Sequence, residues 1–205
     1  VFGASIPGQS AATIFRFQVL ATGPTASMRY PRTDDSWNYV GGMVPDGSLT
    51  SNLPVFHWMM LPSDYQLALD NKFTDNEYPA VFIYNGALFD NMAVRVRGDR
   101  ARNFPKLHWL FKFPQGHEFA ATGLYPLPVQ EFCLQGCYAD KSYMREILSY
   151  ETYRDAGCPS RLINPVALFQ NGAYYGLYMT MESMEKEYLT RNGLDEEGAW
   201  YKSGQ

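Results

Sequence analysis

The sequence predicts an α+β fold, in which an antiparallel sheet with one main packed helix is preceded by strands from a β-sandwich-type region. Three observations predict it. Short β-prone runs fill the first 50 residues, Asn-Gly dipeptides at 85–86 and 171–172 mark tight hairpins, and one helical stretch lies between positions 140 and 157. The second part of the chain therefore follows the order strand, strand, helix, strand, strand, helix.

Residues 1–50 are predicted to form the C-terminal strands of a β-sandwich-like region. In the run 13–20, every second residue from Phe15 is apolar, as in a strand with one buried face, and a second run covers 37–40. The core of this part is too small to be stable alone. A polar joint at 45–52 then marks a domain boundary, and a second domain is expected over 53–205.

The second domain begins with an apolar strand over 53–60 and a short helix that starts near Pro62. Two hairpins follow, one with its first strand at 80–84 and one with its first strand at 166–170. Both turn at Asn-Gly, which tolerates the positive φ angles that a tight primed turn requires.

The main helix is expected to begin at a cap formed by Asp140 or Ser142 and to end at Gly157. A second helix is expected over 184–191, before Asn192-Gly193. The apolar stripe that would pack the main helix on the sheet comprises Tyr143, Ile147, Tyr150 and either Tyr153 or Ala156, widened by Met144 and Leu148.

Composition excludes several classes of protein. Among 205 residues, 46% are hydrophobic and 16% aromatic, which excludes intrinsic disorder, and 17 basic against 21 acidic residues argue against a nucleic-acid partner. No run approaches the roughly 20 apolar residues of a membrane span. The start at Val1 has neither Met nor a leader, so we expect a mature or excised piece.

The cysteines and histidines predict no metal or hydrolase site. Cys133, Cys137 and Cys158 lack the spacing of a zinc site, and the three histidines are scattered. Cys133 and Cys137 could form one disulfide bridge in an oxidising compartment or remain buried thiols, and both alternatives stay open.

Basic residues are concentrated in one short segment, where Asp99 is the only acid. They are Arg95, Arg97, Arg100, Arg102, Lys106 and Lys112. Arg95 and Arg97 alternate with valines and should share one strand face, before Gly98 allows a sharp turn. Such a face could hold phosphate groups, or it could be a solvated surface paired with nearby acids.

Two further positions could belong to a site. Lys106 precedes an apolar run that would draw its stem into the fold, so its amine should need an acidic or phosphate partner. Glu182 ends the apolar strand 174–181 just before a helix. It could line a ligand-binding edge, or it could be an ordinary carboxylate at a helix N-terminus.

The basic segment 94–106 resembles the R-G-N-S-S-R-x-F-P-K-K-S segment of the CotH proteins, the spore-coat kinase family. Three further motifs match in the family's order, and the start of the domain is similar at 53–55. The matching motifs are 140–145 with the helix end at 155–157, 171–178 followed by Glu182, and Trp200-Tyr201-Lys202. The resemblance covers about 53–205, and residues 1–50 resemble the β-sandwich tail that often precedes this domain in secreted bacterial members.

This resemblance implies an atypical protein kinase that uses ATP with Mg²⁺ or Mn²⁺ to phosphorylate Ser or Thr in secreted or coat proteins. The expected location is extracellular or the cell surface. In the kinase-like N-terminal lobe, Lys106 would bind phosphate, Arg97 and Arg102 would flank the phosphates, and Glu182 would border the adenine. The chain ends before the region where the family carries its catalytic and metal-binding aspartates, so no catalytic or metal residue is assigned.

Two departures from the family pattern support an alternative function. Leu107 and His108 stand where the family has a second lysine and a serine, and residues 99–101 are Asp-Arg-Ala in place of Asn-Ser-Ser. The alternative is a non-catalytic surface or assembly protein that keeps the fold for adhesion or packing with other surface proteins. Its abundant Tyr and Phe would suit such interfaces.

Overall fold

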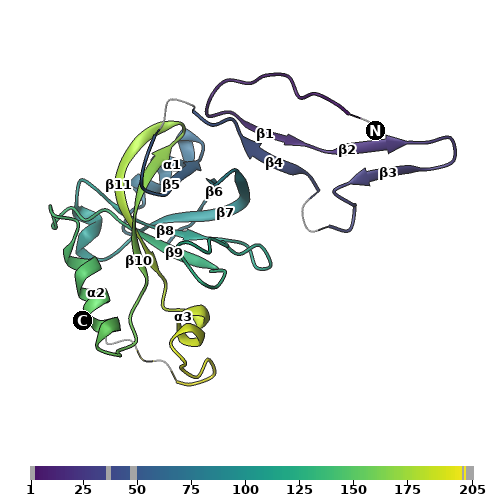
Figure 1. Cartoon of the computed structure of the whole chain (residues 1–205). Coiled ribbons are helices and arrows are strands. Elements are labelled where there is room, and N and C mark those ends of the chain that lie inside the picture. Colours follow the sequence, from purple (N-terminus) through teal and green to yellow (C-terminus); the bar gives the residue numbers. More distant parts are fainter. Residues whose placement is uncertain (1–2, 36–37, 47–49, 200, 202–205) are drawn as a thin grey trace.

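A seven-stranded closed β-barrel forms the body of the protein (Figure 1). The computed structural model describes residues 3–35, 38–46, 50–199 and 201. The barrel corrects the predicted α+β fold, in which an antiparallel sheet with one packed helix would form a kinase-like N-terminal lobe. Closure depends on a parallel pair between β5 (Val55–Met59) and β10 (Ile163–Gln170), more than a hundred residues apart in sequence. Local sequence patterns predict strands and turns but not a pairing at this separation.

The strands follow one another around the barrel in the order β10, β11, β9, β8, β7, β6 and β5, and all neighbours except β5 and β10 are antiparallel. The remaining elements are α1 (Pro62–Asp70), β6 (Tyr78–Tyr84), β7 (Ala87–Arg97), the 3₁₀ turn η1 (Arg100–Asn103), β8 (His108–Lys112), β9 (Glu131–Gln135), α2 (Arg145–Asp155), β11 (Ala173–Glu182) and α3 (Lys186–Arg191).

Both predicted hairpins are confirmed. β6 and β7 turn at Asn85-Gly86, and β10 and β11 turn at Asn171-Gly172, with φ between 47° and 83° at all four positions. The Asn171 side chain also accepts a hydrogen bond from the Met60 N–H and donates one to the Met60 carbonyl, each at 3.0 Å. The second turn is thereby tied to the end of β5, next to the parallel pair that closes the barrel.

The barrel interior is packed with aromatic side chains. Trp58 on β5 lies 4.9 Å from Trp109 on β8 between ring centroids, and Phe82 on β6 meets Phe56 edge-to-face at the same distance. The segment between β8 and β9 contributes to this core, because Phe119 is fully buried there. This burial supplies the main driving force for the fold.

Helix α2 packs outside the barrel on a second, smaller core. Tyr143, Ile147 and Tyr150 pack there as predicted, whereas Met144, Leu148, Tyr153 and Ala156 are exposed. The buried members of this core are Leu110, Cys133, Cys137, Ile163, Met179 and Met181.

The main helix is also shorter than predicted. It begins at Arg145, because Tyr143 takes a left-handed φ of 58° that no α-helix continues. The side chain of Asp140 still accepts hydrogen bonds from the N–H groups of Ser142 and Arg145. Cys133 and Cys137 are free thiols in this structure, the second of the two alternatives.

The N-terminal part forms two two-stranded ribbons that extend away from the barrel (Figure 1). β1 (Ile14–Phe17) pairs with β4 (Val40–Met43), and β2 (Val19–Thr22) pairs with β3 (Ser27–Tyr30). These ribbons do not show a β-sandwich. The expected β-sandwich-like region over residues 1–50 and the domain boundary at 45–52 therefore stay predictions. Trp37 of the predicted strand and positions 47–49 of the joint lie outside the described residues, as do positions 200 and 202 of the last motif.

A polar contact ties the N-terminal ribbons to the barrel. Asp90 on β7 accepts hydrogen bonds from the Arg16 guanidinium at 2.8 Å and from the Tyr39 hydroxyl, and it is only 8% exposed.

Among the described residues, no helix is long and apolar enough to cross a membrane.

Candidate phosphate-binding site

Strand β7 presents the predicted basic residues on its outer face. Val94 and Val96 are buried in the barrel, so Arg95 and Arg97 point outward. In the ladder between β7 and β8, Arg97 pairs with His108. Because Lys106 lies two residues before His108, the fold brings Arg97 and Lys106 to the same end of this strand pair.

The amine of Lys106 is half-buried against tyrosines. Its Nζ donates hydrogen bonds to the Tyr143 hydroxyl at 2.7 Å and to the Leu177 carbonyl at 2.5 Å. It also lies 4.7 Å from the ring centroid of Tyr143 and 4.6 Å from that of Tyr178, within the range of cation–π attraction. The prediction that this lysine would be drawn into the fold is confirmed, but its partners in the structure are tyrosines and a carbonyl and not the acidic side chain that was one of the two expected.

Two glycines lie next to this lysine. A Cβ at Gly136 would lie 2.8 Å from the Lys106 carbonyl oxygen, and a Cβ at Gly176 would lie 3.7 Å from its Nζ. Gly176 also has a φ of 148°, a conformation that L side chains rarely adopt. A side chain at Gly136 would therefore crowd the backbone of Lys106, whereas at Gly176 it is the backbone conformation that favours glycine.

Arg97 is a cation without a fixed partner. It makes no hydrogen bond or ion pair with any residue that the structure describes. Its field nevertheless acts on two neighbours. Burial lowers the pKa of His108 to about 4, with Arg97 and Lys106 contributing, so the imidazole is neutral at pH 7. Burial raises the pKa of Glu146, and the charge of Arg97 is one of the effects that oppose this shift.

Glu146 is a residue that the sequence reasoning missed. It lies in the first turn of α2, and its Oε2 is buried without a hydrogen-bond partner among the described residues. Burial raises the pKa of Glu146, with Arg161 and Arg97 opposing that shift. The available signal was its spacing within the helix, since Glu146 precedes Tyr150 by four positions, which places both side chains on one helix face.

Arg102 faces a different environment. Its guanidinium donates to Asp75 at 2.6 Å, to the Thr74 carbonyl at 2.8 Å and to the Gly98 carbonyl. Arg95 contacts the same Asp75 oxygen at 2.8 Å. Arg102 therefore holds the turn after β7 against the segment that follows α1, and with Phe73, Asp75, Gly98 and Asp99 it lines a cavity of about 270 Å³.

Glu182 is also committed to protein contacts. It is 2% exposed and accepts hydrogen bonds from Arg191 at 2.6 Å and from the Leu162 N–H at 3.1 Å. Of the four predicted ligand-binding residues, the fold thus groups Lys106 with Arg97. Arg102 and Glu182 each have their own ionic partner.

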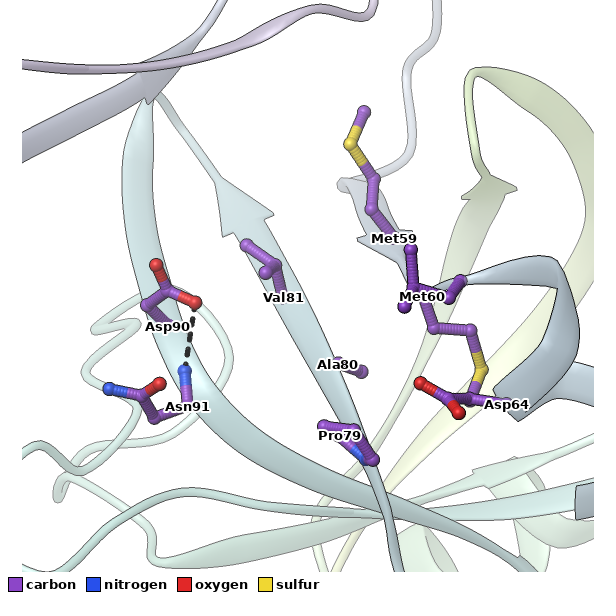
Figure 2. A pocket seen from close by; sticks show the side chains of 9 residues that line it. Met59, Met60, Asp64, Pro79, Ala80, Val81, Asp90 and Asn91 are labelled. Carbon is purple, nitrogen blue, oxygen red and sulfur yellow. Dashed lines mark hydrogen bonds between the residues drawn. The ribbon is translucent and has the colours of Figure 1, made fainter.

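A second cavity of about 330 Å³ lies between β5, the start of α1 and the strands β6 and β7 (Figure 2). Methionines and small apolar residues of β5 and β6 form much of its lining, with Asp64 on one side and Asp90 and Asn91 on the other. Asp90 lines this cavity and also accepts the hydrogen bond from Arg16. The cavity therefore lies next to the contact that attaches the N-terminal ribbons.

Comparison with known proteins identifies the family. A family model described as CotH kinase protein matches residues 94–205, more than half of the chain. The chain belongs to the CotH family. It is also 27% identical over 151 residues to the inner spore coat protein H of Bacillus subtilis (strain 168), a match that covers 74% of this chain and 40% of that relative. The CotH match begins within β7 and includes Arg97, Lys106, Glu146 and Glu182.

Proposed function

We propose that this CotH-family chain binds the phosphate groups of ATP through Lys106 and Arg97, as part of a protein kinase acting on Ser or Thr of coat or secreted proteins. The observation that carries the proposal is that these two cations lie at the same end of the β7–β8 ladder. The amine of Lys106 is sheltered, and Arg97 has no hydrogen-bond or ion-pair partner among the described residues. An ammonium and a guanidinium are the donors that phosphate oxygens accept best.

The charge balance of this site also suits an anion. Lys106 and Arg97 carry two positive charges, His108 is neutral at pH 7, and Glu146 opposes them with one carboxylate. The local excess of positive charge stands out in a chain with a net charge of −4. Phosphoryl transfer depends mainly on positioning and on neutralising phosphate charge, so these groups would orient the nucleotide.

We assign no metal ligand. Within the part of the chain that the structure describes, no group of three or more His, Cys, Asp or Glu side chains could hold a metal ion. A divalent cation bound with ATP would neutralise phosphate charge, and the residues of this chain would act on the nucleotide from the other side. Arg102 would then shape the turn after β7, and Glu182 would stabilise the junction between β11 and α3.

A location in a spore coat or at a cell surface fits the homology to a spore coat protein. The second candidate function, a non-catalytic assembly protein, is favoured by one observation. The ribbon β2–β3 exposes Val19, Leu20, Met28 and Tyr30, which are each at least 51% accessible. Apolar residues displayed on a protruding ribbon could pack against other coat proteins.

Calorimetric titration with Mg-ATP and with adenosine separates the two functions. The kinase proposal predicts saturable binding of Mg-ATP, weaker binding of adenosine, and weakening of the ATP affinity as salt rises, because salt screens the phosphate contacts. Binding of neither ligand would favour the assembly function. Equal affinity for adenosine and ATP would contradict phosphate recognition by Lys106 and Arg97.

A further inference from the structure

Tyr143 occupies a conformation that bulky residues seldom adopt. Its φ is 58°, in the left-handed region, and it lies in the turn that separates β9 from α2. Such a conformation persists only where surrounding contacts compensate for it. The side chain of Tyr143 packs on the second core, and its hydroxyl meets the amine of Lys106 at 2.7 Å.

The amine of Lys106 is nearly saturated in this arrangement. An ammonium has three N–H donors, and two of them are used by the Tyr143 hydroxyl and the Leu177 carbonyl. The rings of Tyr143 and Tyr178 take up further faces of the cation at under 5 Å. An incoming phosphate must therefore displace at least one of these partners before it can bind the amine through more than one hydrogen bond.

Tyr143 is the partner that can be displaced. The Leu177 carbonyl belongs to strand β11, where Leu177 pairs with Ala167 of β10, and this ladder fixes its position. Tyr143 lies in a turn outside the barrel and is only partly buried. A neutral phenol is also a weaker acceptor for an ammonium than a charged phosphate oxygen.

We propose that Tyr143 is a latch that holds the amine of Lys106 in a withdrawn position, and that a phosphate group displaces it. The inference rests on the proposed function and adds a regulatory step at the same site. In the latched state, the hydroxyl of Tyr143 accepts the hydrogen bond from Nζ. In the ligand-bound state, a phosphate oxygen takes that bond, and the turn before α2 moves away from β11.

The variant Tyr143→Phe tests the latch without any nucleotide. It keeps the ring and removes only the hydroxyl, so the second core keeps its packing. Trace labelling with an amine-reactive acylating reagent, followed by mass spectrometry, should show Lys106 labelled faster by roughly fivefold, the factor expected for loss of one hydrogen bond. Labelling of Lys106 at the wild-type rate would overturn the latch.

Tyr138 and Lys141 supply a matched control. The amine of Lys141 lies 4.0 Å from the ring centroid of Tyr138, and both residues are exposed. Tyr138→Phe should leave the labelling rate of Lys106 unchanged, and Tyr143→Phe should leave that of Lys141 unchanged. If Tyr138→Phe accelerated Lys106 to the same extent, a general loosening of this region would replace the specific latch.

The wild-type protein provides a second test that needs no variant. Saturating inorganic tripolyphosphate should increase nitration of Tyr143 by tetranitromethane, because the phenol is released, while nitration of Tyr138 stays constant. In parallel, Tyr143→Phe should bind Mg-ATP more tightly by about the same factor as its gain in labelling. Unchanged nitration and unchanged ATP affinity would overturn the displacement step.

These readouts separate the latch from the proposed function. If Mg-ATP binds but Lys106 is labelled equally in both proteins, the phosphate site stands and the latch is wrong. If neither protein binds Mg-ATP or tripolyphosphate, the proposed function fails and the displacement step fails with it, whatever the labelling shows.

Discussion

Arg97 and His108 are direct partners in the antiparallel pair β7–β8, so a position that differs from the CotH segment lies next to Arg97. His108 stands where the family has a serine, and burial keeps it uncharged at pH 7. Leu107 stands where the family has a second lysine, and its side chain is in the barrel core. Neither departure removes Arg97 from the outer face of β7, or Lys106 from the same end of the strand pair.

His108 should make stability depend on pH below neutrality. Burial and the two cations lower its pKa from 6.5 to about 4, so the unfolded chain takes up the proton first as pH falls. Its contribution to stability is complete above pH 6.5 and decreases down to about pH 4, by up to about 3 kcal/mol. Urea unfolding of His108→Gln should show a flatter profile across this window than the wild type. An equal flattening in His117→Gln would contradict the assignment.

Glu146 should have the opposite pH dependence. Its folded pKa is raised by burial, so the native state holds the proton more strongly, and stability decreases as pH rises from 4.5 through the raised value. Glu146→Gln removes this cost, and its melting temperature at pH 7 should exceed that of the wild type. Glu151→Gln, an exposed site on the same helix, should not do so. A lower melting temperature in Glu146→Gln would show that the carboxylate is stabilising.

The ion pair between Glu182 and Arg191 should be essential for stability. Arg191→Met leaves a carboxylate with 3% side-chain exposure without its charge partner. Breaking a buried pair on one side costs about 3–5 kcal/mol, which urea unfolding would detect as a lower midpoint. Lys186→Met breaks an ion pair that is 70% and 87% exposed, and it should change the midpoint little. Similar midpoints for the two variants would show that this carboxylate does not depend on its partner.

Replacing Arg97 and replacing Arg102, the two predicted phosphate-flanking arginines, should have different effects on ATP binding and on stability. Arg97→Met is expected to weaken Mg-ATP binding by roughly tenfold with an unchanged melting temperature, because Arg97 contacts no described residue through a hydrogen bond or ion pair. Arg102→Met should lower the melting temperature, because it leaves the Thr74 and Gly98 carbonyls without their donor and leaves Asp75 with Arg95 alone. The reverse pattern in calorimetry and thermal melts would assign the ligand role to Arg102.

Local features of the fold could be predicted from sequence because they depend on neighbouring residues. The Asn-Gly turns, the start of α1 at Pro62 and the outward face of Arg95 and Arg97 all follow from short-range geometry. Barrel closure could not be predicted, because it depends on the parallel pairing of β5 with β10 across the chain. The family motifs identified the CotH relationship that the comparisons confirm.

The same distinction applies to the site. The apolar run after Lys106 predicted a sheltered amine, and the amine is sheltered. The partners of Arg102 and Glu182 lie on separate segments, at Asp75 and Arg191, and nothing in the basic cluster itself indicated them. Glu146 could not be identified from the sequence, because an acid in the first turn of a helix is common. Only the packing of α2 shows that its Oε2 is buried.

Replacing Lys106 tests the central claim most directly. Lys106→Met keeps the apolar stem between the tyrosines and removes the amine, and Lys72→Met removes an amine beside the ring of Phe73 as a matched control. Calorimetric titration with Mg-ATP should show affinity reduced by roughly tenfold or more in Lys106→Met and unchanged in Lys72→Met. Equal affinities in the wild type and both variants would contradict phosphate binding by Lys106.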